Sequence, residues 1–138
     1  MHRTAFCLLV GVVASASIAH AASPDIYIWD VLKRPNYVAA YRRMVSGEKR
    51  LPEWIATPDQ LARSVTTSAG TVRSAGGNTE EVFSMCKAHE CDSKTFVIFF
   101  SQYGDVAKSV LRVNGSLRFL GYPTPDERTA LISELPPQ

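Results

Sequence analysis

The sequence is 138 residues long, 46% of its residues are hydrophobic, and its formal net charge at pH 7 is +2. A chain of this length is expected to form one domain with its own hydrophobic core. The small net charge gives no strong field toward nucleic acid or an anionic membrane, and we expect neither as a partner.

The N-terminus has the pattern of a secretory signal peptide. Arg3 is followed by the apolar run AFCLLVGVVA, and the small residues Ala19 and Ala21 occupy the two positions that signal peptidase reads. The apolar run is short for a helix that crosses a bilayer. We therefore expect residues 1–21 to be a cleaved signal peptide and residues 22–138 to form a single exported domain.

Removal of the signal peptide would leave few reactive side chains. It takes away two of the three histidines, one of the three cysteines and Arg3, so the formal net charge falls from +2 to +1. The remaining cysteines and histidine, Cys86, Cys91 and His89, all lie in the stretch CKAHEC. An even number of cysteines in an exported chain predicts a bonded pair.

Helical spacing is clear in the first half of the expected domain. Between Pro35 and Gly47, apolar side chains recur at helical intervals, which predicts a helix with one buried face. The segment LPEWIA, residues 51–56, is interpreted as extended, with Trp54 as a core or interface side chain. The earlier stretch IYIWDVL suits either a strand or a helix.

Strand signals follow in the second half. We predict strands near Val72, over 80–86 and over 95–101. The last of these, TFVIFFS, is apolar on both faces and is therefore expected at the centre of the sheet. Asn114 and Gly115 predict a tight hairpin between two further strands, because both residues tolerate a positive φ.

A short helix is predicted near the C-terminus, where Thr124, Pro125 and Glu127 have the spacing of a capped helix start. Together these elements predict an α+β fold, an antiparallel sheet of about five strands with helices packed on it. The loop from Cys86 to about Lys94 would join two neighbouring strands and protrude from one end of the sheet. A disulfide across it would hold the loop in one shape and stabilise the fold by about 2 kcal/mol.

Several functions are compatible with the stretch CKAHEC. It can be a structural staple of a hairpin, in which His89 is only a polar loop residue, or a surface that recognises another protein. A redox or metal protein of the cell envelope is the alternative of a different class. Redox motifs usually place two residues between their cysteines, whereas this loop has four. A metal site formed by Cys86, His89 and Cys91 lacks an identifiable fourth ligand.

Enzymatic function has little support in the sequence. A catalytic Cys–His pair is disfavoured, because export favours oxidation of the nucleophile and no other histidine remains to act as a base. The sequence contains no Gly-rich phosphate loop and neither HExxH nor GxSxG. We therefore expect no enzyme activity, no cofactor and no bound metal.

The loop resembles the signature of the periplasmic inhibitors of vertebrate lysozyme, the Ivy family. The family motif is Cys-Lys-Pro-His-Asp-Cys; the chain matches both cysteines, Lys87 and His89, keeps an acid as Glu90, and has Ala88 in place of proline. The segment YRRMVSGEKRLPEWI is similar to the helix, glycine turn and Leu-Pro-x-Trp segment that precede the loop in that family. The resemblance covers about residues 37–101.

This resemblance implies an α+β homodimer of the bacterial periplasm that blocks the cleft of C-type lysozyme with its disulfide-closed loop. The inhibitory loop would consist of Cys86, Lys87, Ala88, His89, Glu90 and Cys91. His89 would be the key contact with the catalytic carboxylates, flanked by Lys87 and Glu90, and a Cys86–Cys91 disulfide would shape the loop. Lytic transglycosylases are an alternative target, because they also act on peptidoglycan in a cleft with a catalytic acid.

Two departures from the family motif lead to expectations about binding. Alanine at position 88 lacks the fixed φ of proline, so we expect a more adaptable loop and weaker binding. Glu90 is longer than aspartate and is expected to shift a contact near His89. Lysozyme is typically basic, and a chain with a charge near +1 offers it little long-range attraction, so we also expect slow association.

Overall fold

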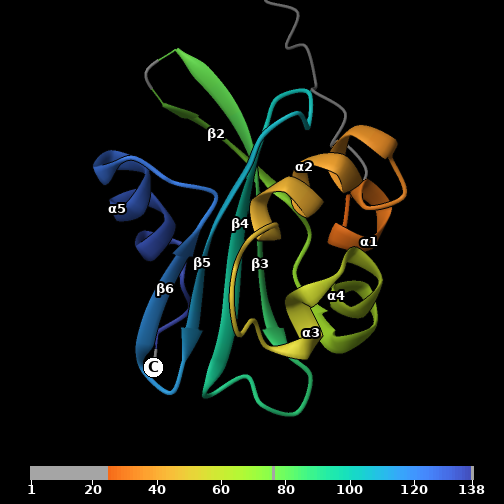
Figure 1. The fold of residues 1–138 in the computed structure, drawn as a ribbon. Coiled ribbons are helices and arrows are strands. Elements are labelled where there is room, and N and C mark those ends of the chain that lie inside the picture. The colour runs from red at the N-terminus through yellow and green to blue at the C-terminus, as the bar shows by residue number, and fades with distance from the viewer. Residues whose placement is uncertain (1–24, 76, 138) are drawn as a thin grey trace, which may run out of the picture.

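The computed structural model describes residues 25–75 and 77–137. The predicted signal peptide, residues 1–21, lies outside the described residues. The fold belongs to the α+β class, as predicted, and has an antiparallel sheet with helices packed on it (Figure 1). In the part of the chain that the structure describes, no helix is long and apolar enough to cross a membrane.

Within the described residues, six strands form one sheet in which all neighbours are antiparallel. The order is β1-β3-β4-β5-β6, and β2 pairs with the part of β3 that β1 leaves uncovered. The strands are β1 (Val65–Thr67), β2 (Thr71–Ala75), β3 (Asn78–Lys87), β4 (Lys94–Ser101), β5 (Ala107–Val113) and β6 (Ser116–Leu120). The strand β1 was not predicted, and the others correspond to the predicted ones.

The central strand is β4, as its sequence predicts. Phe96, Ile98 and Phe100 belong to the larger core cluster, which also contains the buried side chains of α1 to α4. Val97 and Phe99 belong to a second cluster on the other face, where Leu131 of α5 is buried. Both faces of β4 are covered, so every residue from 95 to 100 is buried.

Among the described residues, four helices cover one face of the sheet and one covers the other (Figure 1). They are α1 (Ile28–Val31), α2 (Pro35–Val45), α3 (Glu53–Ala56), α4 (Pro58–Ser64) and α5 (Pro125–Ser133). The helix predicted from Pro35 is confirmed as α2, and Gly47 follows it with a φ of 78°. The ambiguous stretch IYIWDVL contains the helical turn α1.

The prediction of an extended segment at LPEWIA is wrong, because residues 53–56 form the helical turn α3. Pro52 precedes this turn with a φ of −56°, and its carbonyl oxygen accepts a hydrogen bond of 3.1 Å from the N–H of Ile55. Trp54 and Ile55 are both buried in the same core cluster, whereas a strand would point consecutive side chains to opposite faces. The prediction that Trp54 is a core side chain is confirmed.

The tight turn and the capped helix start that were predicted in the second half of the chain are confirmed. Asn114 and Gly115 connect β5 and β6 with φ values of 49° and 82°, as a type I′ turn requires. At the start of α5, the hydroxyl of Thr124 accepts a hydrogen bond of 3.3 Å from the N–H of Glu127. The Glu127 carboxylate accepts one of 2.7 Å from the N–H of Thr124, which completes the predicted capping box.

Candidate functional site

The stretch CKAHEC lies at one end of the sheet, in the loop that joins β3 to β4 (Figure 1). Cys86 pairs with Thr95 in the sheet, so the loop connects two neighbouring strands, as predicted. Cys86 and Cys91 form a disulfide bond, with their Cα atoms 4.8 Å apart. The bond closes a ring over residues 86–91, and residues 92 and 93 connect this ring to β4.

His89 occupies a strained position in a tight turn. The N–H of Glu90 donates a hydrogen bond of 2.9 Å to the carbonyl oxygen of Lys87, which closes a four-residue turn. His89 is the third residue of this turn and has a φ of 67°, whereas Ala88 before it is not among the residues with positive φ. This is the pattern of a type II turn, which favours glycine at the third position and proline at the second.

The backbone strain at His89 is a local cost in stability. A residue other than glycine at positive φ typically costs about 1 kcal/mol, although histidine, like asparagine and aspartate, is found there more often than most, and such positions cluster at functional sites. The His89 side chain is exposed, so no packing in the described chain offsets this cost. The turn thus keeps an imidazole on the surface where glycine would be more favourable.

The backbone of α4 anchors the loop beside the turn. The N–H of Ala88 donates a hydrogen bond of 2.8 Å to the carbonyl oxygen of Ser64, the last residue of α4. Val65, which follows it, pairs with Lys87 in the sheet. A proline at position 88 would have no N–H for this bond. The alanine therefore has an anchor that the proline of the family motif lacks.

Glu90 is engaged within the loop. Its carboxylate forms ion pairs with the ammonium groups of Lys87 and Lys94, and the Lys94 N–H donates a hydrogen bond of 2.9 Å to its carbonyl oxygen. Hydrogen bonds from these two ammonium groups hold the pKa of the Glu90 carboxyl below its ordinary value. Glu90 therefore links the two strands at the base of the loop.

The β5–β6 hairpin supports the far side of the loop. The N–H of Asn114 donates a hydrogen bond of 2.8 Å to the carbonyl oxygen of Ser93. On the side of α3 and α4, a groove of about 490 Å³ runs along the loop base. It is lined by Pro52, Glu53, Trp54, Gln60, Ser64, Lys87, Lys94 and Val113.

Sequence reasoning identified the six residues of CKAHEC but missed Lys94 and Ser64, which help to hold them in place. Lys94 lies four residues after Glu90, and this spacing of opposite charges could have indicated the pair. Ser64 contributes only its backbone carbonyl, so no side-chain pattern could have indicated its role.

The site presents an exposed imidazole on a closed and anchored loop. Imidazole offers a ring nitrogen that donates and one that accepts, so it can bind two oxygen atoms of a partner at once. Within residues 25–75 and 77–137, no three side chains of His, Cys, Asp and Glu gather in a group that could hold a metal ion. The exposed groups of the loop suit recognition of a partner by hydrogen bonds.

Comparison with known proteins gives distant relatives. No protein-family model matches the chain. A protein named inhibitor of vertebrate lysozyme from Escherichia coli strain K12 is 32% identical over 91 residues, which cover 66% of this chain and 52% of the relative. The protein of the same name from Escherichia coli O157:H7 matches equally well.

A further relative is an uncharacterized protein of Yersinia pestis, 31% identical over 74 residues that cover 52% of this chain and 44% of that protein. The chain spans about half the length of the curated relatives it matches. The similarity supports the resemblance to the Ivy family at modest identity, and two of these relatives are named as inhibitors.

Proposed function

We propose that this chain is a periplasmic protein inhibitor of C-type lysozyme. The loop from Cys86 to Cys91 enters the substrate cleft, and His89 binds the catalytic carboxylates. The observation that carries the proposal is an exposed histidine held at positive φ on a disulfide-closed loop. The similarity to proteins named inhibitors of vertebrate lysozyme supports the choice of target.

The loop is suited to enter a cleft because it is already ordered. A disulfide, a hydrogen bond from Ala88 to Ser64, one from Asn114 to Ser93, and the ion pairs of Glu90 all restrain it. A segment that is already held in its bound shape loses little conformational entropy when it binds. The restraints therefore favour affinity without adding contacts to the partner.

The imidazole of His89 matches the chemistry of a retaining glycosidase. Such a cleft holds two carboxyl groups about 5 Å apart, one protonated near neutral pH and one ionised. Imidazole can accept a hydrogen bond from the protonated acid and donate one to the ionised acid. A ligand that occupies both acids excludes the water and the substrate that the reaction needs.

Glu90 has a supporting role in this proposal. Its carboxylate is occupied by Lys87 and Lys94, so it does not place an unpaired negative charge beside the acids of the target. Repulsion between carboxylates at the entrance of the cleft would otherwise weaken binding. Lys87 and Glu90 thus form an ion pair beside His89.

The test is the rate of cell-wall lysis by a C-type lysozyme with increasing amounts of the protein. We expect the intact protein to inhibit and His89→Ala to lose at least about a hundredfold in inhibition constant, because the acids would be left covered but unpaired. Tyr122→Ala is the matched control, since Tyr122 is 92% exposed and lies beyond β6, at the other end of the sheet.

If the intact protein leaves lysozyme fully active, the choice of target is wrong, and lytic transglycosylases are the next class to assay. If the intact protein and His89→Ala inhibit equally, the role of His89 is wrong. Analytical ultracentrifugation of the same samples tests the homodimer that the resemblance implies.

A further inference from the structure

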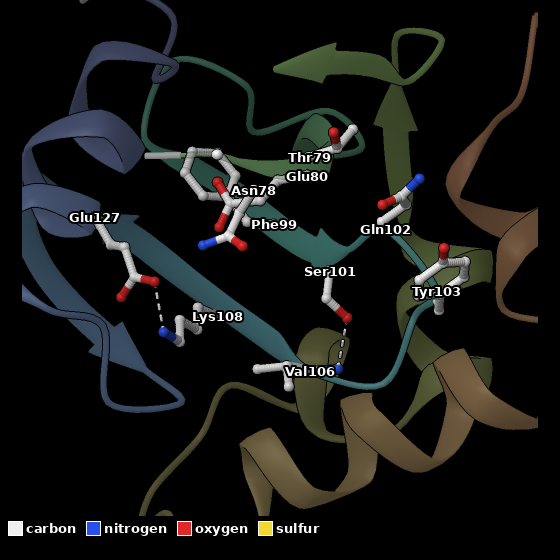
Figure 2. A pocket seen from close by; sticks show the side chains of 11 residues that line it. Asn78, Thr79, Glu80, Phe99, Ser101, Gln102, Tyr103, Val106, Lys108 and Glu127 are labelled. Carbon is white, nitrogen blue, oxygen red and sulfur yellow. Dashed lines mark hydrogen bonds and ion pairs between the residues drawn. The ribbon is translucent and has the colours of Figure 1, made fainter. Parts of the chain in front are cut away.

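A second recess lies at the opposite end of the sheet from the disulfide-closed loop. The strand β3 starts at Asn78 beside this pocket and ends at Lys87 beside the loop. The pocket has a volume of about 340 Å³ and is formed by the starts or ends of β3, β4 and β5, the β4–β5 loop and α5. Figure 2 shows Gln102 and Tyr103 on one side of it and Lys108 and Glu127 on the other.

The charges around this pocket balance. Lys108 and Glu127 form an ion pair of 2.5 Å, and Arg73 and Glu80 form one of 3.4 Å. Burial alone would raise the pKa of Glu127, but hydrogen bonds from Lys108 and from the Thr124 backbone lower it below its ordinary value. Each carboxylate thus has a basic partner, so the pocket favours neither a phosphate nor a cation.

Polar groups of both kinds converge on the pocket. The amides of Asn78 and Gln102 each carry donors and an acceptor. The Glu80 carboxylate also lines the pocket, and one of its oxygens is buried 3.4 Å from the Arg73 guanidinium. Amides that both donate and accept suit a neutral, polar ligand.

An aromatic ring stands at the rim on a rigid loop. Tyr103 is 71% exposed, although its backbone carbonyl accepts a hydrogen bond from the Asn36 side chain. The hydroxyl oxygen of Ser101 accepts hydrogen bonds of 3.0 Å from the N–H groups of Asp105 and Val106. At Gly104, which has a φ of 73°, a side chain would collide with the ring of Tyr37. The loop is thus fixed in a shape that exposes Tyr103.

We propose that this pocket binds an uncharged saccharide. A sugar ring presents hydroxyl groups that both donate and accept, which matches the amides of Asn78 and Gln102 at the pocket. Its C–H groups form an apolar face that packs on an exposed aromatic ring such as Tyr103. The volume lies at the lower end of the range of small-molecule sites, so one or two sugar rings are the appropriate size.

The experiment is an NMR titration of the ¹⁵N-labelled protein with chitotriose and, separately, with maltotriose, up to about 10 mM. We expect shifts of the amide signals of 78–80 and 101–106, with a millimolar dissociation constant, and none at Lys87–Cys91. Tyr103→Ala should weaken binding at least about tenfold. Tyr122→Ala removes a tyrosine that is more exposed than Tyr103 and lies outside this pocket, and it should leave binding unchanged.

Three outcomes overturn the proposal: no shifts with either saccharide, equal shifts with inorganic phosphate, or unchanged shifts in Tyr103→Ala. Shifts with only one of the two sugars support it and identify which sugar is accepted. Lysozyme inhibition by Tyr103→Ala is measured in parallel and should equal that of the intact protein. The saccharide site and the proposed inhibitory loop can therefore fail independently.

Discussion

The two ends of the sheet differ in how they present polar groups. At one end the β3–β4 loop protrudes and exposes His89 on a backbone at positive φ, held by a disulfide and by backbone hydrogen bonds. At the other end polar side chains line a recess, and its charges are paired across elements that are distant in the sequence. A protrusion can enter a partner's cleft, whereas a recess can only receive a ligand.

Among changes to the framework of the two ends, as distinct from His89 itself, the largest effect is expected when the covalent restraint at the loop end is removed. Cys86→Ser with Cys91→Ser should destabilise the protein by about 2 kcal/mol and weaken lysozyme inhibition at least about tenfold, because the freed loop must be ordered on binding. Chemical denaturation and the lysis assay measure the two quantities. Inhibition equal to that of the intact protein would contradict preorganisation by the disulfide.

The next largest effect concerns the charge pair within the loop. Glu90→Gln removes the partner of both Lys87 and Lys94 and should weaken inhibition severalfold. Asp92→Asn makes the same change of charge at an exposed neighbour and is the control. An equal effect of both substitutions would show that only the net charge matters.

The same pair predicts a dependence on pH. The pKa of Glu90 is lower in the folded protein than its ordinary value, so its contribution to stability is present above about pH 4.3 and is lost as the pH falls through the lowered pKa. The free energies of unfolding of the intact protein and of Glu90→Gln should therefore converge at acid pH. A stability difference that stays constant from neutral pH to the acid limit of the titration would contradict this linkage.

A change at the pocket end should affect stability but leave inhibition unchanged. Lys108→Gln breaks the partly buried ion pair with Glu127 and should destabilise the protein by about 1 kcal/mol. Lysozyme inhibition should stay within twofold of the intact protein, as measured in the same lysis assay. A loss of inhibition well beyond the loss of stability would show that the two ends are coupled.

The smallest effect is expected for Ala88→Pro, which introduces the residue of the family motif. Proline suits the second position of the type II turn, but it removes the N–H that binds the carbonyl oxygen of Ser64. The two contributions oppose each other, so the free energy of unfolding should change by less than about 1 kcal/mol. Ala88→Gly keeps the N–H and separates the two contributions.

Local rules predicted much of this fold. Asn114-Gly115 and the capping box of Thr124 and Glu127 depend on neighbouring residues, and both are confirmed. The segment LPEWIA was misjudged because the packing of Trp54 and Ile55 against the sheet decides its conformation. That packing involves residues distant in the sequence and is absent from the local pattern.

The two ends also differ in what the sequence could predict. The loop lies within one short motif, so its residues were identified, whereas its anchor on the carbonyl oxygen of Ser64 has no side-chain signal. The pocket combines residues from β3, β4, β5 and the β4–β5 loop with Glu127 of α5, and only the strand pairing and the packing of α5 bring them together. No spacing in the sequence indicates such a site.

The contact between His89 and the catalytic acids is tested most directly by a double-mutant cycle. Binding is measured by calorimetry for the intact protein and His89→Ala, each against lysozyme with its catalytic glutamic acid intact or replaced by alanine. We predict that the two substitutions are coupled by at least about 1.5 kcal/mol, as for close polar pairs across an interface. Additive effects of the two substitutions would contradict direct contact.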